Sequence, residues 1–163
     1  MTAILLPSPD LFLREDAIRG GMDLIFFTNT RYLKSADERL AAAGLGRAHH
    51  RVMYFVQRKP DITVSELHQI LGITKQSYNR VAKDLIARNL MIQRVGEKDR
   101  RHRLLRLTDE GAALERTIFE ELHGKVAHAY SAAGGEAVRG FWSVLQHLIG
   151  EEGRTMFGAV QRL

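Results

Sequence analysis

The segment Ile73–Thr108, ITKQSYNRVAKDLIARNLMIQRVGEKDRRHRLLRLT, combines one helical pattern, two short strand patterns and a strong positive charge. Between Thr74 and Arg106 there are ten Lys and Arg residues and three Asp and Glu residues, which gives a net charge of +7. The whole chain has a formal net charge of +5, so the rest of it carries about −2. A basic helix followed by a basic hairpin on a mildly acidic body is typical of proteins that bind duplex DNA.

The first part of this segment is predicted to be an amphipathic helix that begins after Thr74. Its apolar residues recur at helical spacing and share one side: Tyr78, Val81, Leu85 and Ile86. The opposite side contains no Asp or Glu and carries Lys75, Gln76, Asn79, Arg80 and Lys83. Gln and Asn can pair with adenine and Arg with guanine, so this side is suited to contacting bases in the major groove. A core position for Tyr78 is favoured over base stacking, because Tyr78 lies on the apolar side.

A short helix and a tight turn precede the amphipathic helix. Thr63-Val64-Ser65-Glu66 is a capping box, in which Thr and Glu side chains bond each other's backbone amides. Gly72 is expected to end the short helix. A short helix, a turn with glycine and an amphipathic helix together predict a helix-turn-helix.

After Asn89 the hydrophobic period changes to two, which predicts the strands Met91–Val95 and Leu104–Leu107. The strands flank a charged tip, Gly96–Arg103, and form a β-hairpin. Thr108 is expected to cap the helix that follows, with two acidic residues at its positive end.

Long helical patterns lie on both sides of this region. Residues 10–43 are expected to form one helix that begins at about Asp10 or Asp16, with Gly20-Gly21 either bending it or marking its true start. A second helix is expected from Arg47 to Gln57. Beyond the hairpin, one helix extends to about Ala132 and another from Glu136 to about Val160. The last helix is expected to bury Val138, Phe141, Trp142, Leu145, Leu148, Ile149 and Met156. One side of a small domain cannot cover a first helix that is so long and so broadly apolar, so its surplus surface needs another chain or a long second helix. Two long apolar helices at opposite ends of the chain can interlock across a two-fold axis, which favours a dimer core over a cofactor site.

The composition excludes several classes of protein. The chain of 163 residues contains no cysteine, which excludes a disulfide framework and a thiolate zinc site. No apolar run is long enough to span a membrane, and the N-terminus lacks the cationic region of a signal peptide. We expect a cytoplasmic protein with no membrane partner and no cofactor.

Specific residues in and after the hairpin add to what the order of these elements indicates. Asp99-Arg100-Arg101, followed by Leu105, Leu107, Thr108 and Gly111, resembles the wing signature of the MarR family, and Leu85–Met91 resembles that family's exit from the recognition helix. Asn89 stands where the family often has glycine, and Asn tolerates the left-handed conformation. The resemblance implies a mainly α fold (α+β, with a small β-hairpin wing) in a single MarR-like domain, 1–163. Residues 45–108 would form the winged helix-turn-helix DNA-binding lobe, and residues 10–43 and 109–163 would be dimerisation helices.

The resemblance also implies a function: a homodimeric transcriptional regulator, usually a repressor, that binds double-stranded DNA and is released by a small-molecule effector. Arg101 would be the wing arginine that enters the minor groove, and Asp99 would orient it. Together with the recognition helix, the implied DNA-binding residues are Thr63, Ser65, Thr74, Lys75, Gln76, Ser77, Asn79, Arg80, Lys83, Asp99, Arg100, Arg101, His102 and Arg103.

Effector pockets in this family lie between the dimerisation helices and the DNA-binding lobe. Asn29 and His50 are polar residues among apolar neighbours, and with Tyr54 they are candidates to line such a pocket. The seven histidines do not have the spacing of a metal site: His49 and His50 would point apart on a helix, and His123 and His128 are five residues apart. No metal site is predicted.

Two other function classes remain to be weighed. A helical hydrolase or transferase would need a nucleophile with a base, paired carboxylates or a metal set, and none occurs at a suitable spacing. A DNA-architectural protein would use the same fold without choosing a sequence, but Gln76 and Asn79 on the outer side of the helix argue for base contacts. A charged hairpin that only protects edge strands would not explain so many cations at the tip.

Overall fold

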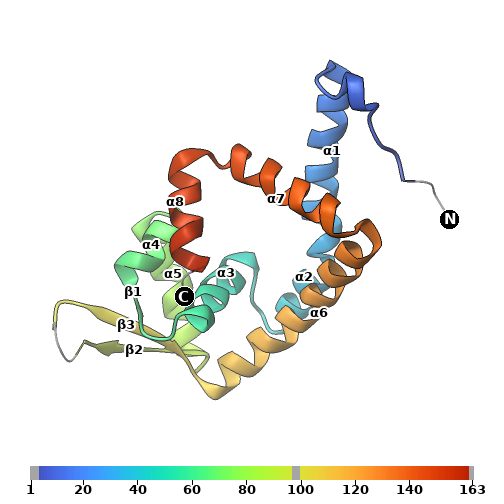
Figure 1. The fold of residues 1–163 in the computed structure, drawn as a ribbon. Coiled ribbons are helices and arrows are strands. Elements are labelled where there is room, and N and C mark those ends of the chain that lie inside the picture. Colours follow the sequence, from blue (N-terminus) through green and yellow to red (C-terminus); the bar gives the residue numbers. More distant parts are fainter. Residues whose placement is uncertain (1–3, 97–99, 162–163) are drawn as a thin grey trace.

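The computed structural model describes residues 4–96 and 100–161, and Figure 1 shows how their helices and strands are arranged. The elements in chain order are η1 (Pro9–Leu11), α1 (Glu15–Tyr32), α2 (Lys34–Ala42), α3 (Arg47–Arg58), β1 (Ile62–Thr63), α4 (Val64–Leu71), α5 (Lys75–Ala87), β2 (Met91–Val95), β3 (Arg103–Leu107), α6 (Asp109–Ala133), α7 (Gly135–Leu148) and α8 (Gly150–Gln161). The predicted fold class, mainly α with a small β wing, is confirmed.

Helix α3 lies at the centre of the winged-helix lobe. It packs against α4, α5, β3 and the long helix α6. Val52, Met53 and Val56 on α3 are at most 1% exposed. Helix α5 contributes Leu85 to the same core, and α6 contributes Ile118. The lobe and the first half of α6 therefore share one hydrophobic core.

The described residues form an antiparallel sheet with the strand order β1-β3-β2. In the hairpin, Met91 pairs with Leu107 and Val95 pairs with Arg103, so β3 begins one residue before the predicted start. Strand β1 was not predicted, because two residues are too few to show a period. It adds to the outer edge of β3 through the pair Ile62 and Leu105, both fully buried.

The predicted caps are present. The Glu66 amide donates to Thr63 Oγ1 at 3.2 Å, and the Thr63 amide donates to Glu66 Oε2 at 2.9 Å. The Ser77 amide donates to Thr74 Oγ1 at 3.2 Å, which starts α5. Asn89 follows α5 with φ of 55°, the left-handed conformation expected of it. These local bonds fix where the helix-turn-helix begins and ends.

Two long helices were predicted where the structure has shorter ones. The N-terminal run is divided at Leu33, where α2 turns to bury Leu40 in the core while α1 extends away from it (Figure 1). Lys125 of α6 donates to the Tyr32 carbonyl at 3.3 Å and so satisfies a group at the end of α1. The C-terminal run is divided at Gly150, whose φ of 67° ends α7 and favours glycine.

The expectation that the last helix buries its apolar residues within the chain was wrong. Within the described residues, neither α1 nor α7 contains a buried residue. Figure 1 shows why: α1 projects from the body, and α7 crosses from the end of α6 to α8, which returns to the lobe. The large apolar side chains that α1 and α7 expose, between 38% and 68%, are Ile18, Met22, Leu24, Ile25, Phe26, Phe27, Phe141, Trp142, Val144, Leu145 and Leu148. Of the predicted core positions, Val138 and Met156 are half-buried.

The turn between α5 and β2 meets the start of α6 at a very close contact. Thr108 Oγ1 accepts a hydrogen bond from the Gly111 amide at 3.0 Å and donates one to the Asn89 carbonyl at 2.7 Å. A Cβ atom on Gly111 would lie 1.9 Å from the Leu90 carbonyl oxygen. The position therefore requires glycine, because the clashing atom belongs to the backbone.

We expect Gly111→Ala to lower the free energy of unfolding by more than about 3 kcal/mol, since α6 must move away from Leu90. Gly124→Ala is the matched control on the same helix, because its Cβ would meet nothing within 4 Å. It should raise stability by up to about 1 kcal/mol. Chemical denaturation at one fixed protein concentration measures both, and equal stability of Gly111→Ala and the wild type would contradict the contact.

Candidate nucleic-acid interface

Helix α5 separates its two faces as the sequence predicted, with one exception. Tyr78, Val81 and Leu85 are buried. The residues of α5 predicted to contact DNA are exposed: Lys75, Gln76, Ser77, Asn79, Arg80 and Lys83. Ile86 was expected to be buried but is 42% exposed, because it lies beside a hollow between α5 and Gln93 of β2. The polar face of α5 is thus open along its whole length.

Tyr78 has the predicted core position and is 2% exposed. Its ring packs against that of His68 on α4, with 4.7 Å between the ring centroids. Burial raises the pKa of Tyr78 to about 12, so the phenol is neutral. Tyr78 therefore holds α4 and α5 together, and its ring is covered by the protein.

The four small polar residues near the helix starts differ in how accessible their hydroxyl groups are. The Thr63 hydroxyl is occupied within the capping box, where it also donates to Glu66 Oε2 at 2.9 Å. The Thr74 hydroxyl donates to Ser77 Oγ at 3.0 Å, and both side chains are exposed. Ser65 is exposed in the first turn of α4. Ser65, Thr74 and Ser77 are therefore accessible to a phosphate, and Thr63 is better described as a cap.

An acidic residue that the sequence analysis did not single out holds the wing. Asp61, with φ of 67°, accepts from Arg94 Nη2 of β2 at 2.7 Å and from Arg106 Nε of β3 at 3.2 Å. The Arg106 and Arg94 guanidinium groups lower the pKa of Asp61 to about 2. Two of the ten basic residues in the segment are thus paired with a carboxylate from outside it. Asp61 is the only acidic residue between α3 and β1, and this position in the sequence could have pointed to its role.

The wing tip lies partly outside the described residues. Asp99 is among the residues 97–99 that the structure does not describe, so its expected role in orienting Arg101 stays a prediction. Arg100, Arg101, His102 and Arg103 are exposed. The Gly96 amide donates to the His102 carbonyl at 3.0 Å and closes the hairpin below the tip.

The three candidate effector residues lie around one cavity of about 640 Å³ between α1, α3 and α6. Asn29, His50 and Tyr54 line it together with residues that were not predicted: Tyr32, Leu33, Arg47, Arg51, Phe55, Phe119, Leu122, His123 and Val126. The spacing of residues 47, 50, 51 and 54 on one side of α3 could have revealed the arginines. The cavity wall is mainly aromatic and aliphatic.

The polar groups of this cavity are unequally satisfied. Arg47 pairs with Asp37 through two bonds of 2.6 and 2.7 Å and donates to Asn29 Oδ1 at 3.2 Å. His50 Nε2 is buried and has no hydrogen-bond partner among the described residues. Burial lowers the pKa of His50, although Asp37 opposes this effect. A neutral His50 therefore has hydrogen-bonding capacity to offer a ligand.

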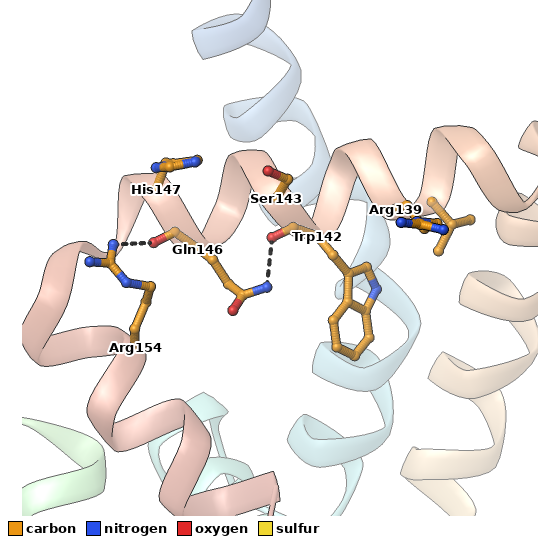
Figure 2. Close-up of a pocket in the computed structure, with 7 residues that line it drawn as sticks. Arg139, Trp142, Ser143, Gln146, His147 and Arg154 are labelled. Carbon is orange, nitrogen blue, oxygen red and sulfur yellow. Dashed lines mark hydrogen bonds between the residues drawn. The ribbon is translucent and has the colours of Figure 1, made fainter.

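A second hollow, of about 560 Å³, lies in the corner between α7 and α8. Figure 2 shows Trp142 and Gln146 of α7 with Arg154 of α8, whose Nη1 donates to the Gln146 carbonyl at 3.2 Å. The sequence predicted no function here. Among residues 4–96 and 100–161, no group of three or more His, Asp and Glu side chains is placed to hold a metal ion. In the same ranges no helix is long and apolar enough to cross a membrane.

Comparison with known proteins identifies the family. The MarR family model matches residues 43–102, which cover the helix-turn-helix and most of the wing. The HTH-type transcriptional regulator PetP of Rhodobacter capsulatus is 42% identical over 139 residues, which span 85% of this chain and 84% of PetP. The chain belongs to the MarR family. It is a DNA-binding transcriptional regulator, as the resemblance implied.

Solved MarR-family structures share the fold. A mutant of MarR from E. coli, complexed with operator DNA, has a TM-score of 0.63 at 20% identity, over 84% of this chain and 98% of that one. NadR in complex with 4-hydroxyphenylacetate has a TM-score of 0.67 at 18% identity, over 89% of this chain and 99% of that one.

Proposed function

We propose that this MarR-family regulator binds a specific, pseudo-palindromic DNA site as a homodimer, with α5 in the major groove. The observation that carries the proposal is the exposed outer face of α5, where Gln76, Asn79 and Arg80 stand together without an acid. These three side chain types can distinguish base pairs by their hydrogen-bond patterns. Two copies related by a two-fold axis would place their α5 helices about one helical turn of DNA apart.

The wing would bind next to the major groove contact. Its exposed cations favour Arg101 as the residue that enters the minor groove, whose negative potential attracts arginine. Other residues would contact neighbouring phosphates. From the wing these are Arg100, His102 and Arg103, and from α4 and α5 and their caps they are Ser65, Thr74, Lys75, Ser77 and Lys83. Asp61 supports this arrangement because it fixes the strands that carry the tip.

Arg80→Ala and Arg101→Ala should weaken DNA binding in different ways. Loss of Arg80 should cost about 1–3 kcal/mol on the preferred sequence and relax the preference at particular base pairs. Loss of Arg101 should weaken binding to most sequences and reduce the salt dependence. The measurement is a titration of duplexes that the wild type selects from a random pool, with random duplex beside them.

Arg116→Ala, at an exposed position on the first half of α6, is the charge-matched control and should leave DNA affinity unchanged. The assignment of α5 and the wing is wrong if neither variant differs from this control at moderate salt. A wild type that binds selected and random duplex equally would instead indicate a DNA-architectural protein.

The dimer would be built from the helices outside the lobe, residues 10–43 and 109–163. The exposed apolar side chains of α1 and α7 support this, since a soluble monomer rarely exposes such an extended apolar surface. Interdigitation with a second copy would bury both helices and set the distance between the two lobes. The remaining residues, 45–108, would act as the DNA-binding lobe.

Phe26→Glu should therefore break the dimer, because it puts a charge at the centre of the apolar face of α1. Size-exclusion chromatography with light scattering should show the mass of one chain, and circular dichroism should show less helix. Ile92→Glu, at an exposed apolar position on β2 outside these helices, should remain dimeric. A wild type with the mass of a single chain would refute the dimer.

The regulator would act as a repressor that a small molecule releases by binding between α1, α3 and α6. The cavity lined by Asn29, His50 and Tyr54 supports this proposal through its apolar wall and the unsatisfied His50 Nε2. A ligand could shift the separation of the lobes only as far as it binds one arrangement better than another. The effector would therefore be a small, largely apolar molecule with a hydrogen-bonding group.

A panel of small aromatic compounds, tested by thermal shift, should contain molecules that stabilise the wild type and weaken its binding to the selected duplex. At a concentration of about 100 times Kd, such a ligand adds about 2.7 kcal/mol of stability. The effect should be lost in His50→Ala and kept in His128→Ala, an exposed histidine outside the cavity. Ligand effects that survive in His50→Ala would place the site elsewhere.

A further inference from the structure

A carboxylate on the inner side of α5 joins the recognition helix to a distant part of the chain. Asp84 Oδ1 accepts from Arg88 Nε at 2.8 Å, and Asp84 Oδ2 lies 3.0 Å from His49 Nε2. Hydrogen bonding to Arg88 lowers the pKa of Asp84, so the group is ionised near neutral pH. One carboxylate thus holds a guanidinium from the C-terminal end of its own helix and an imidazole from α3.

Both partners of Asp84 also form hydrogen bonds with the connection between α2 and α3. Arg88 Nη1 donates to the carbonyl of Ala43, the C-cap of α2, at 3.0 Å. His49 Nδ1 accepts from the amide of Gly46, the residue that starts α3, at 3.1 Å. Because Nδ1 accepts, Nε2 carries the hydrogen that is directed at Asp84. These hydrogen-bonded contacts therefore fasten the recognition helix to residues 43–46.

The connection is shaped to receive Arg88. Gly44 has φ of 68°, and a Cβ atom there would lie 3.0 Å from Arg88 Nη1 and 3.3 Å from Nη2. A side chain at this position would both strain the backbone and push the guanidinium away. The approach of Arg88 and the conformation of Gly44 therefore depend on each other.

The other end of this connection belongs to the helices proposed to form the dimer. Helix α2 buries Ala36 and Leu40 in the shared core and packs against α6. Arg39 of α2 also donates to Glu121 of α6 at 3.3 Å. A displacement of α2 and α6 would therefore be transmitted to α5 by residues 43–46 as well as by the apolar core.

We propose that Asp84, His49 and Arg88 are positioning residues that set the orientation of the recognition helix relative to α2 and α6. This rests on the proposed role of α5 in reading bases. The three side chains contact no base themselves. They restrict rotation of α5 about its axis, so that Gln76, Asn79 and Arg80 face the groove together.

The physical reason is the difference between apolar and directional contacts. Val81, Ala82 and Leu85 hold α5 against the core, but apolar contacts have no preferred direction and allow small rotations. The clasp, meaning the contacts among Asp84, His49, Arg88, Ala43 and Gly46, fixes direction and distance. The side chains of its ion pairs are 18% to 41% exposed, so these pairs themselves add little stability. Their loss should therefore affect orientation more than folding.

The test compares the affinity of the full-length protein for two probes: a duplex selected from a random pool by the wild type, and random duplex of the same length. Arg88→Lys keeps the charge, but a lysine cannot bond Asp84 and the Ala43 carbonyl in the fork geometry of arginine. We expect the ratio of the two affinities to fall about tenfold, with random-duplex affinity and the salt slope unchanged. Asp84→Asn should lower the ratio similarly while raising random-duplex affinity, because it removes a negative charge.

Glu120→Gln is the control for the charge, since it removes one carboxylate from an exposed position on α6 and should leave the ratio unchanged. Thermal unfolding identifies a variant that is merely unstable. A wild-type ratio near one would overturn the proposed base reading by α5, and the clasp with it. A high wild-type ratio that Arg88→Lys and Asp84→Asn retain within about twofold would overturn the clasp alone.

Discussion

The burial of α3 is the constraint on which the other parts of this molecule depend. Val52, Met53 and Val56 fix α3 inside the lobe, where it contacts the elements that bear the DNA-facing residues. The same helix packs against α6, so the lobe cannot move far from α6 without opening the core. The first turn of α3 then presents Arg47 and His50 to the cavity on one side and His49 to Asp84 on the other. One helix therefore borders the core, the candidate effector cavity and the recognition helix.

The charge of the DNA-binding segment is organised by a few acids rather than spread evenly. Asp61 pairs with Arg94 and Arg106, and Asp84 pairs with Arg88. These three arginines contribute to the positive potential over the surface, but their ion pairs hold the wing strands and the recognition helix in place. A simple count of cations therefore overestimates how many are placed to contact phosphates. The residues that remain for DNA lie on the outer face of α5 and at the wing tip.

The sequence predicted those parts of the fold that local chemistry determines. The Thr63 and Glu66 caps, the polar face of α5 and the hairpin all depend on residues close together in the chain. Errors arose where distant contacts decide the outcome: β1 forms because Ile62 is buried beside Leu105, and α2 turns at Leu33 because Leu40 packs in the core. Gly150 was overlooked because a single glycine within an apolar helical pattern does not by itself end a helix. Of the candidate site, the outer residues were predictable from the helical period, whereas Asp61 and the clasp at Asp84 involve partners 33 to 45 residues away.

The unburied helices explain why the recognition helices need a directional connection. Neither α1 nor α7, both fully within the described residues, contributes a fully buried residue to the core, although Tyr32 of α1 packs against it. Most of the apolar surface of both helices is therefore left uncovered within one chain. If a second copy covers them, the spacing of two lobes is set by contacts between chains, while the orientation of each α5 is set within its own chain. Apolar packing between helices tolerates small rotations, and a rotation of α5 would misalign all of its base-contacting side chains at once. Hydrogen bonds between α5 and residues 43–46 limit that rotation where α2 leads into the lobe, so a shift of the dimer helices would move α5 as a unit. Such a coupling would convert a change in spacing into a change in DNA affinity without disturbing the face that reads the sequence.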